Sequence, residues 1–307
     1  MTIIYFLFGL LLVIIGGDAF VDSSVRIAKR MHVSEMLIGA TLVSIGTTLP
    51  ELIVSATASV HGYSDVAAGN AIGSVICNTA LIAGFVVAFS RFAPDIASFC
   101  RSYAQFFLAA GLYCAFACFG GLSRIAGIGL LLALFLYLFG IYGATKGGSK
   151  IHTSEKLEGS LLLDVPQITL GAALLFIGAN LLVDKGTFLA RQIGIPDHVI
   201  SISMISLGTS LPELFTAVSA IRKKHGALSI GNIVGANILN LLMVSGVSSV
   251  IEPFTPLLSM LRVDIPVMLF VSLLLALPVI LGNKFYRWQG FVLLISYATY
   301  ITHLYIG

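Results

Sequence analysis

Long apolar segments separated by short polar stretches make up the whole chain of 307 residues. A helix needs roughly 20 mainly apolar residues to cross the hydrocarbon core of a bilayer. Ten segments have this length, and they leave no stretch long enough to fold as a soluble domain. The predicted spans are 3–22, 33–60, 66–90, 102–121, 123–144, 161–183, 196–221, 227–251, 263–282 and 288–306.

The polar positions inside these segments repeat at an offset of 162 residues. Residues 44–52 (SIGTTLPEL) match residues 206–214 (SLGTSLPEL) at seven of nine positions, and 69–78 (GNAIGSVICN) match 231–240 (GNIVGANILN) at five of ten. Each repeat holds five spans, an odd number, so the second enters the membrane from the opposite side. Inverted repeats of this kind are a common transporter architecture, with the substrate site near mid-membrane.

The sequence therefore predicts an all-α membrane protein with ten transmembrane helices in two inverted five-helix repeats. The first repeat covers residues 1–146, a cytoplasmic linker covers 147–160, and the second repeat covers 161–307. We expect interrupted helices 2, 3, 7 and 8 to line a mid-membrane cation site.

Composition agrees with this class, because 58% of the residues are hydrophobic and only 10% are charged. Soluble proteins carry roughly a quarter charged residues. Of the 17 Lys and Arg residues, 13 lie in the odd-numbered loops and 4 in the even-numbered loops. Basic loops stay in the cytoplasm, so we expect a cell-membrane protein with both termini extracellular or periplasmic. The basic residues form no patch suited to nucleic acid. The expected surroundings are the lipid bilayer, and nothing in the sequence indicates an obligate protein partner.

Two acidic residues, Glu51 and Glu213, lie in the middle of the second and seventh predicted spans. An acid at the centre of a spanning helix costs about 2.5–3.5 kcal/mol on insertion scales, so a repeated pair indicates function. Pro50 and Pro212 precede them and each removes a backbone donor, which should free carbonyls near residues 44–47 and 206–209. Nearby hydroxyls and amides complete the predicted set of metal ligands: Ser44, Thr47, Thr48, Glu51, Ser74, Asn78, Ser206, Thr209, Ser210, Glu213 and Asn240.

The chemistry of this set favours a hard cation. Calcium prefers six to eight oxygen ligands, and two carboxylates balance one divalent ion. No His or Cys shares the two Glu motifs, so softer metals are disfavoured, and the four cysteines have no CxxC spacing. HExxH, P-loop and GxSxG motifs are absent from the sequence, so we expect neither an enzyme nor a cofactor.

At these motif pairs the sequence resembles the calcium:cation antiporter superfamily, in particular its prokaryotic sodium/calcium exchanger branch. The resemblance covers essentially the whole chain. It implies alternating access in which sodium enters and calcium leaves, with Glu51 and Glu213 as central calcium ligands and Thr47 and Thr209 beside them. It also implies that Ser74, Asn78, Ser210 and the carbonyls near 44 and 206 line the sodium and calcium sites. In such exchangers the first and sixth helices, here near 3–30 and 161–190, slide as a gating bundle.

Two positions depart from the pattern of the resemblance. Position 236 is Ala where exchangers often carry Ser, which removes one possible sodium ligand. Position 240 is Asn where many relatives carry Asp, which argues against potassium co-transport. A proton/calcium antiporter of the same superfamily and a passive cation channel stay open as alternatives, although channels usually build their pores from oligomeric rings.

Overall fold

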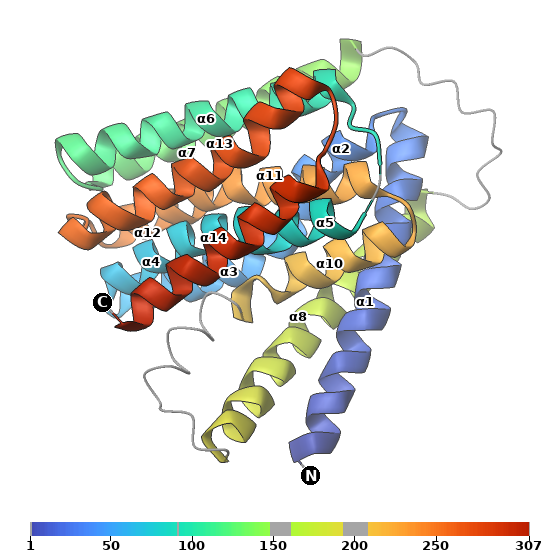
Figure 1. Ribbon diagram of the computed structural model, residues 1–307, viewed down its shortest axis with the longest axis horizontal. Helices are drawn as coiled ribbons and strands as arrows, with labels where there is room; N and C mark the ends of the chain where they lie inside the picture. Colours follow the sequence, from blue (N-terminus) through green and yellow to red (C-terminus); the bar gives the residue numbers. More distant parts are fainter. Residues whose placement is uncertain (1, 91, 148–160, 193–207, 307) are drawn as a thin grey trace.

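The computed structural model describes residues 2–90, 92–147, 161–192 and 208–306, and the regular elements in these ranges are helices (Figure 1). Eight helical segments of the described chain are long and apolar enough to cross a membrane. They are α1 (Thr2–Met31), α2–η1–α3 (Glu35–Val60), α4–η2–α5 (Ser64–Phe89), α6 (Ile96–Phe119), α7 (Arg124–Gly147), α8 (Leu161–Gln192), α11–η3–α12 (Gly226–Ile251) and η4–α13 (Met260–Gly282). Two further helices fall outside this set: α10 (Leu211–Arg222) is too short, and α14 (Arg287–Ile306) is less apolar.

The prediction of an all-α, multi-pass membrane protein is confirmed. The seventh predicted span, 196–221, lies partly outside the described residues, and α10 covers its second half. The tenth predicted span coincides with α14, which is 20 residues long but has a lower mean hydropathy than the eight above. The predicted linker lies almost wholly outside the described residues.

Short π-helical segments occur inside three of the helices that we expected to be interrupted. They are η1 (Gly39–Val43), η2 (Cys77–Ala83) and η3 (Asn240–Val244). The backbone is not unwound at residues 44–47, where we expect Pro50 to free carbonyls: α3 is continuously α-helical over Ser44–Val60 with Pro50 inside it. The extra residue of a π segment loosens the hydrogen-bond ladder without breaking the helix. A break does occur in the second half, where Ser210 forms a turn immediately before α10.

Helices α1 and α8, which correspond to the first and sixth predicted spans, lie side by side and project away from the other helices (Figure 1). The first predicted span ended near residue 22, yet α1 continues to Met31. Its basic last turns are stabilised by Asp164 on α8, which accepts hydrogen bonds from Arg26 Nε at 2.6 Å and from Arg30 Nε at 2.7 Å. The arginines that end the apolar segment of α1 therefore remain within the helix, because they form ion pairs with Asp164.

Two pairs of glycines allow the backbones of α1 and α8 to touch. A Cβ atom on Gly16 would lie 2.9 Å from the Gly171 carbonyl oxygen, and one on Gly178 would lie 2.8 Å from the Gly9 carbonyl oxygen. Small residues that permit close approach are typical of packing between membrane helices. The contact between α1 and α8 therefore depends on the lack of side chains at these positions.

We expect Gly16→Ala and Gly178→Ala each to destabilise the protein by about 1–3 kcal/mol, the usual cost of overpacking. The measurement is the midpoint of thermal unfolding in detergent. Gly111→Ala is the matched control, because a Cβ there meets no atom within 4 Å. Midpoints equal to that of the control would contradict the close packing.

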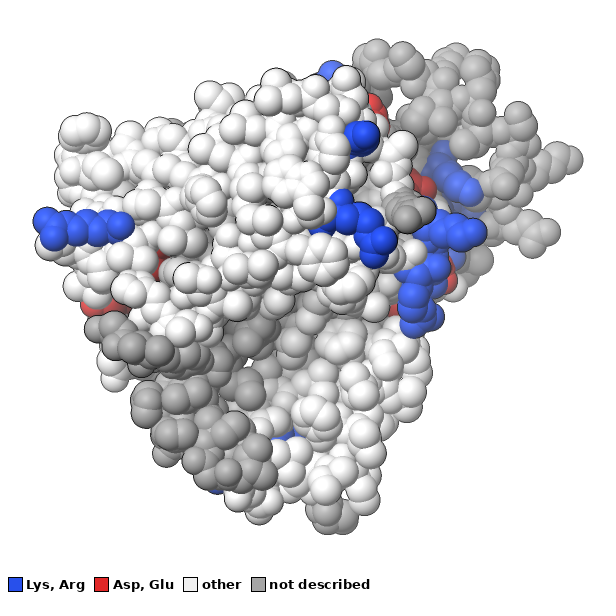
Figure 2. All heavy atoms as spheres, viewed as in Figure 1, with Lys and Arg blue, Asp and Glu red and all other residues white. Residues whose placement is uncertain are grey.

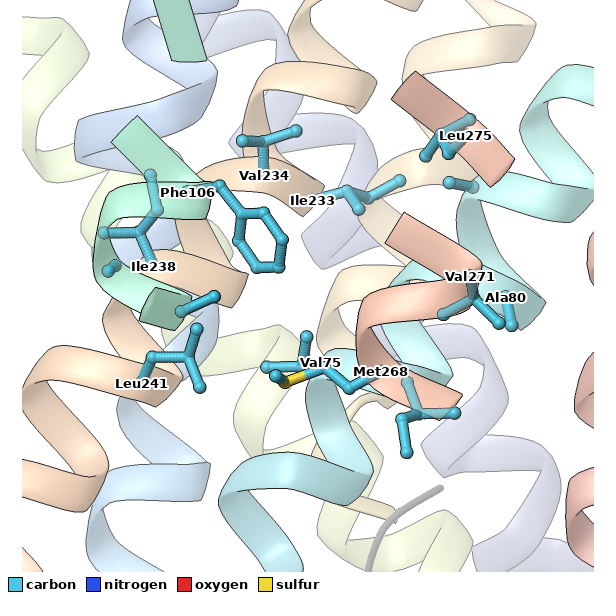
Figure 3. Close-up of a cluster of buried hydrophobic side chains, with 14 of the residues drawn as sticks. Val75, Ala80, Phe106, Ile233, Val234, Ile238, Leu241, Met268, Val271 and Leu275 are labelled. Carbon is cyan, nitrogen blue, oxygen red and sulfur yellow. The ribbon is translucent and has the colours of Figure 1, made fainter. Parts of the chain in front are cut away.

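The centre of the molecule is formed by the third and eighth predicted spans. In the most apolar windows of α4–η2–α5 and α11–η3–α12, 78% and 83% of the residues are buried, against at most 50% in the other candidate spans of the described chain. Figure 3 shows side chains of α4 and α11 meeting those of α6 and α13, with Phe106 between Val234 and Ile238 of α11 on one side and Val75 of α4 on the other. This arrangement places the Asn of both GN motifs, Asn70 and Asn232, in the interior.

Candidate cation site

Glu51 and Glu213 lie in the interior on α3 and α10 and are completely buried. The two carboxyl groups are close enough to interact electrostatically, and the hydroxyls of Thr209 and Ser210 lie close to Glu51. All four carboxyl oxygens lack a geometrically acceptable hydrogen-bond partner among the described groups. Buried polar atoms are almost always satisfied, so a buried pair of acids without such partners among the described groups is a candidate ligand-binding centre.

The local sequence explains how each acid is presented. Pro50 has no N–H group, so the Gly46 carbonyl cannot receive its helical hydrogen bond. Pro212 lies in the first turn of α10, where a missing N–H removes no helical hydrogen bond. Glu213 is in the first turn of α10, where the free N–H groups of a helix favour negative charge. The Glu51 side therefore has a carbonyl oxygen without its helical hydrogen bond, and the Glu213 side has the free N–H groups of a helix start.

Two buried asparagines join the halves of the chain around these acids. Thr47 donates to Asn232 Oδ1 at 3.2 Å, and Thr209 donates to Asn70 Oδ1 at 3.2 Å. Asn70 also donates from Nδ2 to the Glu51 carbonyl oxygen at 3.3 Å and to Ser55 Oγ at 2.9 Å. The two Thr–Asn bonds each join the first half of the chain to the second. Thr47 and Thr209, like Asn70 and Asn232, are separated by the repeat offset of 162 residues.

Sequence analysis did not assign a role to Asn70 or Asn232. Both are the Asn of a repeated GN pair, so the signal that could have found them was the repeat itself. Their amides hold Thr209 and Thr47, which flank the acids, and they are therefore positioning residues of this centre.

Most of the predicted ligands that the structure describes are buried. Ser44 and Thr47 are buried; the Ser44 hydroxyl donates to the Thr41 carbonyl oxygen, and the Thr47 hydroxyl lies within reach of the Ser44 carbonyl oxygen as well as of Asn232 Oδ1. Ser206 lies outside the described residues. The remaining polar side chains have an unpartnered atom and are at most 1% exposed: Thr48, Ser74, Asn78, Ser210 and Asn240.

The donor set consists of oxygen and amide groups. Among the described residues, no group of three or more His, Cys, Asp or Glu side chains could hold a metal ion. A centre of two carboxylates surrounded by hydroxyls, amides and free carbonyls suits hard cations such as calcium and sodium better than soft metals.

The fold and this centre define a polytopic membrane protein with a buried, oxygen-lined polar site. The sequence profile described as "Sodium/calcium exchanger protein" matches residues 1–143 and 165–306. The sodium/calcium exchanger MaX1 of Methanosarcina acetivorans is 32% identical over 97% of this chain and 97% of its own length. The inner membrane protein YrbG of Escherichia coli is 34% identical over 88% of this chain and 86% of its own.

The solved structures agree with the sequence relatives. The sodium-calcium exchanger NCX_Mj, soaked with 2.5 mM Na⁺ and 0.1 mM Ca²⁺, superimposes with a TM-score of 0.86 at 32% identity, covering 99% of this chain and 98% of that one. The chain belongs to the sodium/calcium exchanger family, in the prokaryotic branch of the calcium:cation antiporter superfamily. This is a family of transporters and not of enzymes.

Proposed function

We propose that this protein is a secondary antiporter that exchanges calcium for sodium by alternating access. The observation that carries the proposal is the buried pair of Glu51 and Glu213, whose oxygens have no partner among the described residues. A single divalent cation neutralises the pair, and removal of that ion leaves two buried like charges that sodium ions can compensate. Calcium and sodium therefore compete for one centre, which is the requirement of an exchanger.

The proposed ligands are the residues predicted from the sequence. Glu51 and Glu213 bind calcium, and the set is completed by Ser44, Thr47, Thr48, Ser74, Asn78, Ser206, Thr209, Ser210 and Asn240. Exchange is potassium-independent in this proposal, because the neutral amide of Asn240 supplies no charge for a further cation. Asn240 is buried with both amide atoms unpartnered.

The two halves, 1–146 and 161–307, act as inverted repeats around this centre. The glycine contacts between α1 and α8 support this assignment: Gly9 and Gly16 lie 162 residues before Gly171 and Gly178, and each touches the other's counterpart. Such a self-complementary antiparallel contact is expected of a two-fold axis in the membrane plane. The α1–α8 pair is the proposed moving bundle, because the two helices pack along each other and project away from the other helices (Figure 1).

The termini are proposed to face the outside of the cell. Lys and Arg side chains gather at one end of the molecule in Figure 2, where α1 and α10 end in basic turns. Positive charge favours the cytoplasmic side. The N-terminus of α1 and the C-terminus of α14 then lie on the opposite side.

The test is calcium uptake into proteoliposomes under imposed gradients of sodium, potassium or protons. We expect an outward sodium gradient to drive calcium in against its own gradient, with no stimulation by potassium. Uptake driven only by a proton gradient would favour the proton/calcium antiporter. Calcium flux that never exceeds its electrochemical equilibrium would favour the passive channel.

Ala236 provides a test of the sodium sites. It is fully buried, and its repeat partner Ser74 has a buried hydroxyl with no hydrogen-bond partner in the described part of the chain. Ala236→Ser adds an oxygen to the second half, so the sodium concentration for half-maximal exchange should fall several-fold while calcium affinity changes little. The converse change, Ser74→Ala, should raise the sodium requirement. Equal sodium activation in wild type and Ala236→Ser would contradict this role.

A further inference from the structure

The π segment η1 deprives one backbone carbonyl of its usual donor, just before the helix that carries Glu51. In an α-helix the N–H group of Ser44 would donate to the carbonyl oxygen of Ala40, four residues earlier. Here it donates to the carbonyl oxygens of Gly39 and Thr41 instead. Ala40 is buried, and an unpaired backbone carbonyl in the interior is costly. Its carbonyl therefore needs a donor other than Ser44.

Tyr137 of α7 supplies a donor from a distant part of the chain. Its hydroxyl donates to the Ala40 carbonyl oxygen at 2.8 Å, and the residue is buried. The rest of α7 is an outer helix: it lies beside α6 at the edge of the molecule (Figure 1) and exposes large apolar side chains such as Phe135 and Leu136. Tyr137 therefore connects the outer layer of helices to the backbone of η1.

The turn that Tyr137 contacts lies directly against the second GN motif. A Cβ on Gly235 would lie 2.5 Å from Ala40 Cα and 2.6 Å from Ser44 Oγ, so the two backbones touch. Closely packed interiors transmit a displacement, because they have little empty space to absorb it. A shift of η1 would therefore move Ser44 relative to the second half of the chain.

The same turn leads into the proposed ligands. Ser44 is the first residue of α3, and its carbonyl oxygen lies 3.4 Å from the Thr47 hydroxyl, which also donates to Asn232. Glu51 follows one turn after Thr47 on the same helix. Because α3 is continuous from Ser44 onward, the place of its first turn determines where Thr47 and Glu51 lie.

The bond from Tyr137 is not repeated by its equivalent in the second half. The residue 162 positions later is Thr299, which is exposed and donates within its own helix, to the Ile295 carbonyl oxygen at 2.9 Å. Duplication of the two halves therefore does not account for Tyr137.

We propose that Tyr137 is a positioning residue of the exchange centre: its hydroxyl holds η1 in the place from which α3 presents Thr47 and Glu51 to the cation. The inference rests on the proposed exchange and adds to it a residue from outside the polar site. The ring of Tyr137 also lines a cavity of about 300 Å³ between α6, α7 and α11. Since that side of the ring is not filled, packing leaves it room to move, and the hydrogen bond removes this freedom.

The contact with η1 is tested without any transport measurement. Tyr137→Phe removes the hydroxyl and keeps the ring. Tyr103→Phe is the matched control, because Tyr103 is buried on α6 and its hydroxyl has no hydrogen-bond partner among the described groups. By hydrogen-exchange mass spectrometry in detergent, we expect the amides of residues 39–45 to exchange at least about threefold faster in Tyr137→Phe than in wild type. The amides of residues 265–282 should be unchanged. Unchanged exchange at η1, or an equal rise in both segments, would overturn the proposal.

The effect on the site is tested by sodium-driven calcium uptake. Tyr137→Phe leaves a buried carbonyl without its donor, so the half-saturating calcium concentration should rise by about three- to tenfold. A loss of folded protein alone would lower the maximal rate and leave half-saturation unchanged. Tyr103→Phe should match wild type, and an equal defect in this control would overturn the proposal.

The two measurements also separate this inference from the proposed function. Wild-type half-saturation in Tyr137→Phe, together with faster amide exchange at η1, would show that the bond holds the backbone without positioning the ligands, and the proposal would be wrong. Failure of wild type to exchange calcium for sodium would instead contradict the proposed function. Amide exchange would then still decide whether Tyr137 holds η1.

Discussion

Glu51→Gln and Glu213→Gln are each expected to abolish sodium-driven calcium uptake. Either change leaves one carboxylate to balance a divalent ion in a site that is completely buried. In such surroundings an uncompensated charge is far more costly than in water. We expect a loss of at least a hundredfold in the initial rate of calcium uptake into proteoliposomes, which brings the flux to the background of empty vesicles.

The two variants should still fold and insert. An amide is cheaper to bury than a carboxylate, and all four carboxyl oxygens lack a hydrogen-bond partner that the change could remove. The elution profile in detergent should therefore match that of wild type. Glu252→Gln is the matched control, since Glu252 is exposed at the end of α12 and should leave uptake unchanged. Full uptake by either interior variant would exclude the paired acids as the calcium site.

Asn70→Ala and Asn232→Ala are expected to lower calcium uptake by tenfold or more. Asn70 accepts a hydrogen bond from the Thr209 hydroxyl and donates one to the Glu51 carbonyl oxygen, and Asn232 accepts one from the Thr47 hydroxyl. Removal of an amide leaves these buried groups unpaired, at a cost of about 1–3 kcal/mol each. The site should lose its geometry, so the half-saturating calcium concentration should rise together with the fall in maximal rate.

Asn180→Ala is the matched control for these variants. Asn180 is exposed on α8 and donates within its own helix, to the Phe176 carbonyl oxygen at 2.9 Å. It should leave both kinetic parameters unchanged. Wild-type kinetics in Asn70→Ala would contradict the idea that the bonds between the halves position the threonines.

Much of the architecture was predictable because the cost of placing a residue in hydrocarbon is a local property of the sequence. The lengths of the apolar segments identified the spans, and the same cost singled out Glu51 and Glu213 as acids that need a function. The repeat at 162 residues then grouped the hydroxyls and amides with these acids. The family could be recognised from these motifs alone.

Contacts between distant helices determined what the sequence could not. The α1 helix extends to Met31 because Asp164, on a helix far along the chain, pairs with its arginines. The loosened backbone lies at η1 and not at residues 44–47, and Tyr137 from α7 donates to the Ala40 carbonyl oxygen there at 2.8 Å. Hydropathy carries no information about such partners.

The sequence by itself determined the membrane class, the spans and the central acids, because each depends on the transfer of single residues out of water. Only the tertiary structure decided that Asn70 meets Thr209, 139 residues away, and that Asn232 meets Thr47, 185 residues away. The physical reason is that hydrogen bonds and cavities are made where helices cross, and the crossing is fixed by packing between side chains that lie far apart along the chain.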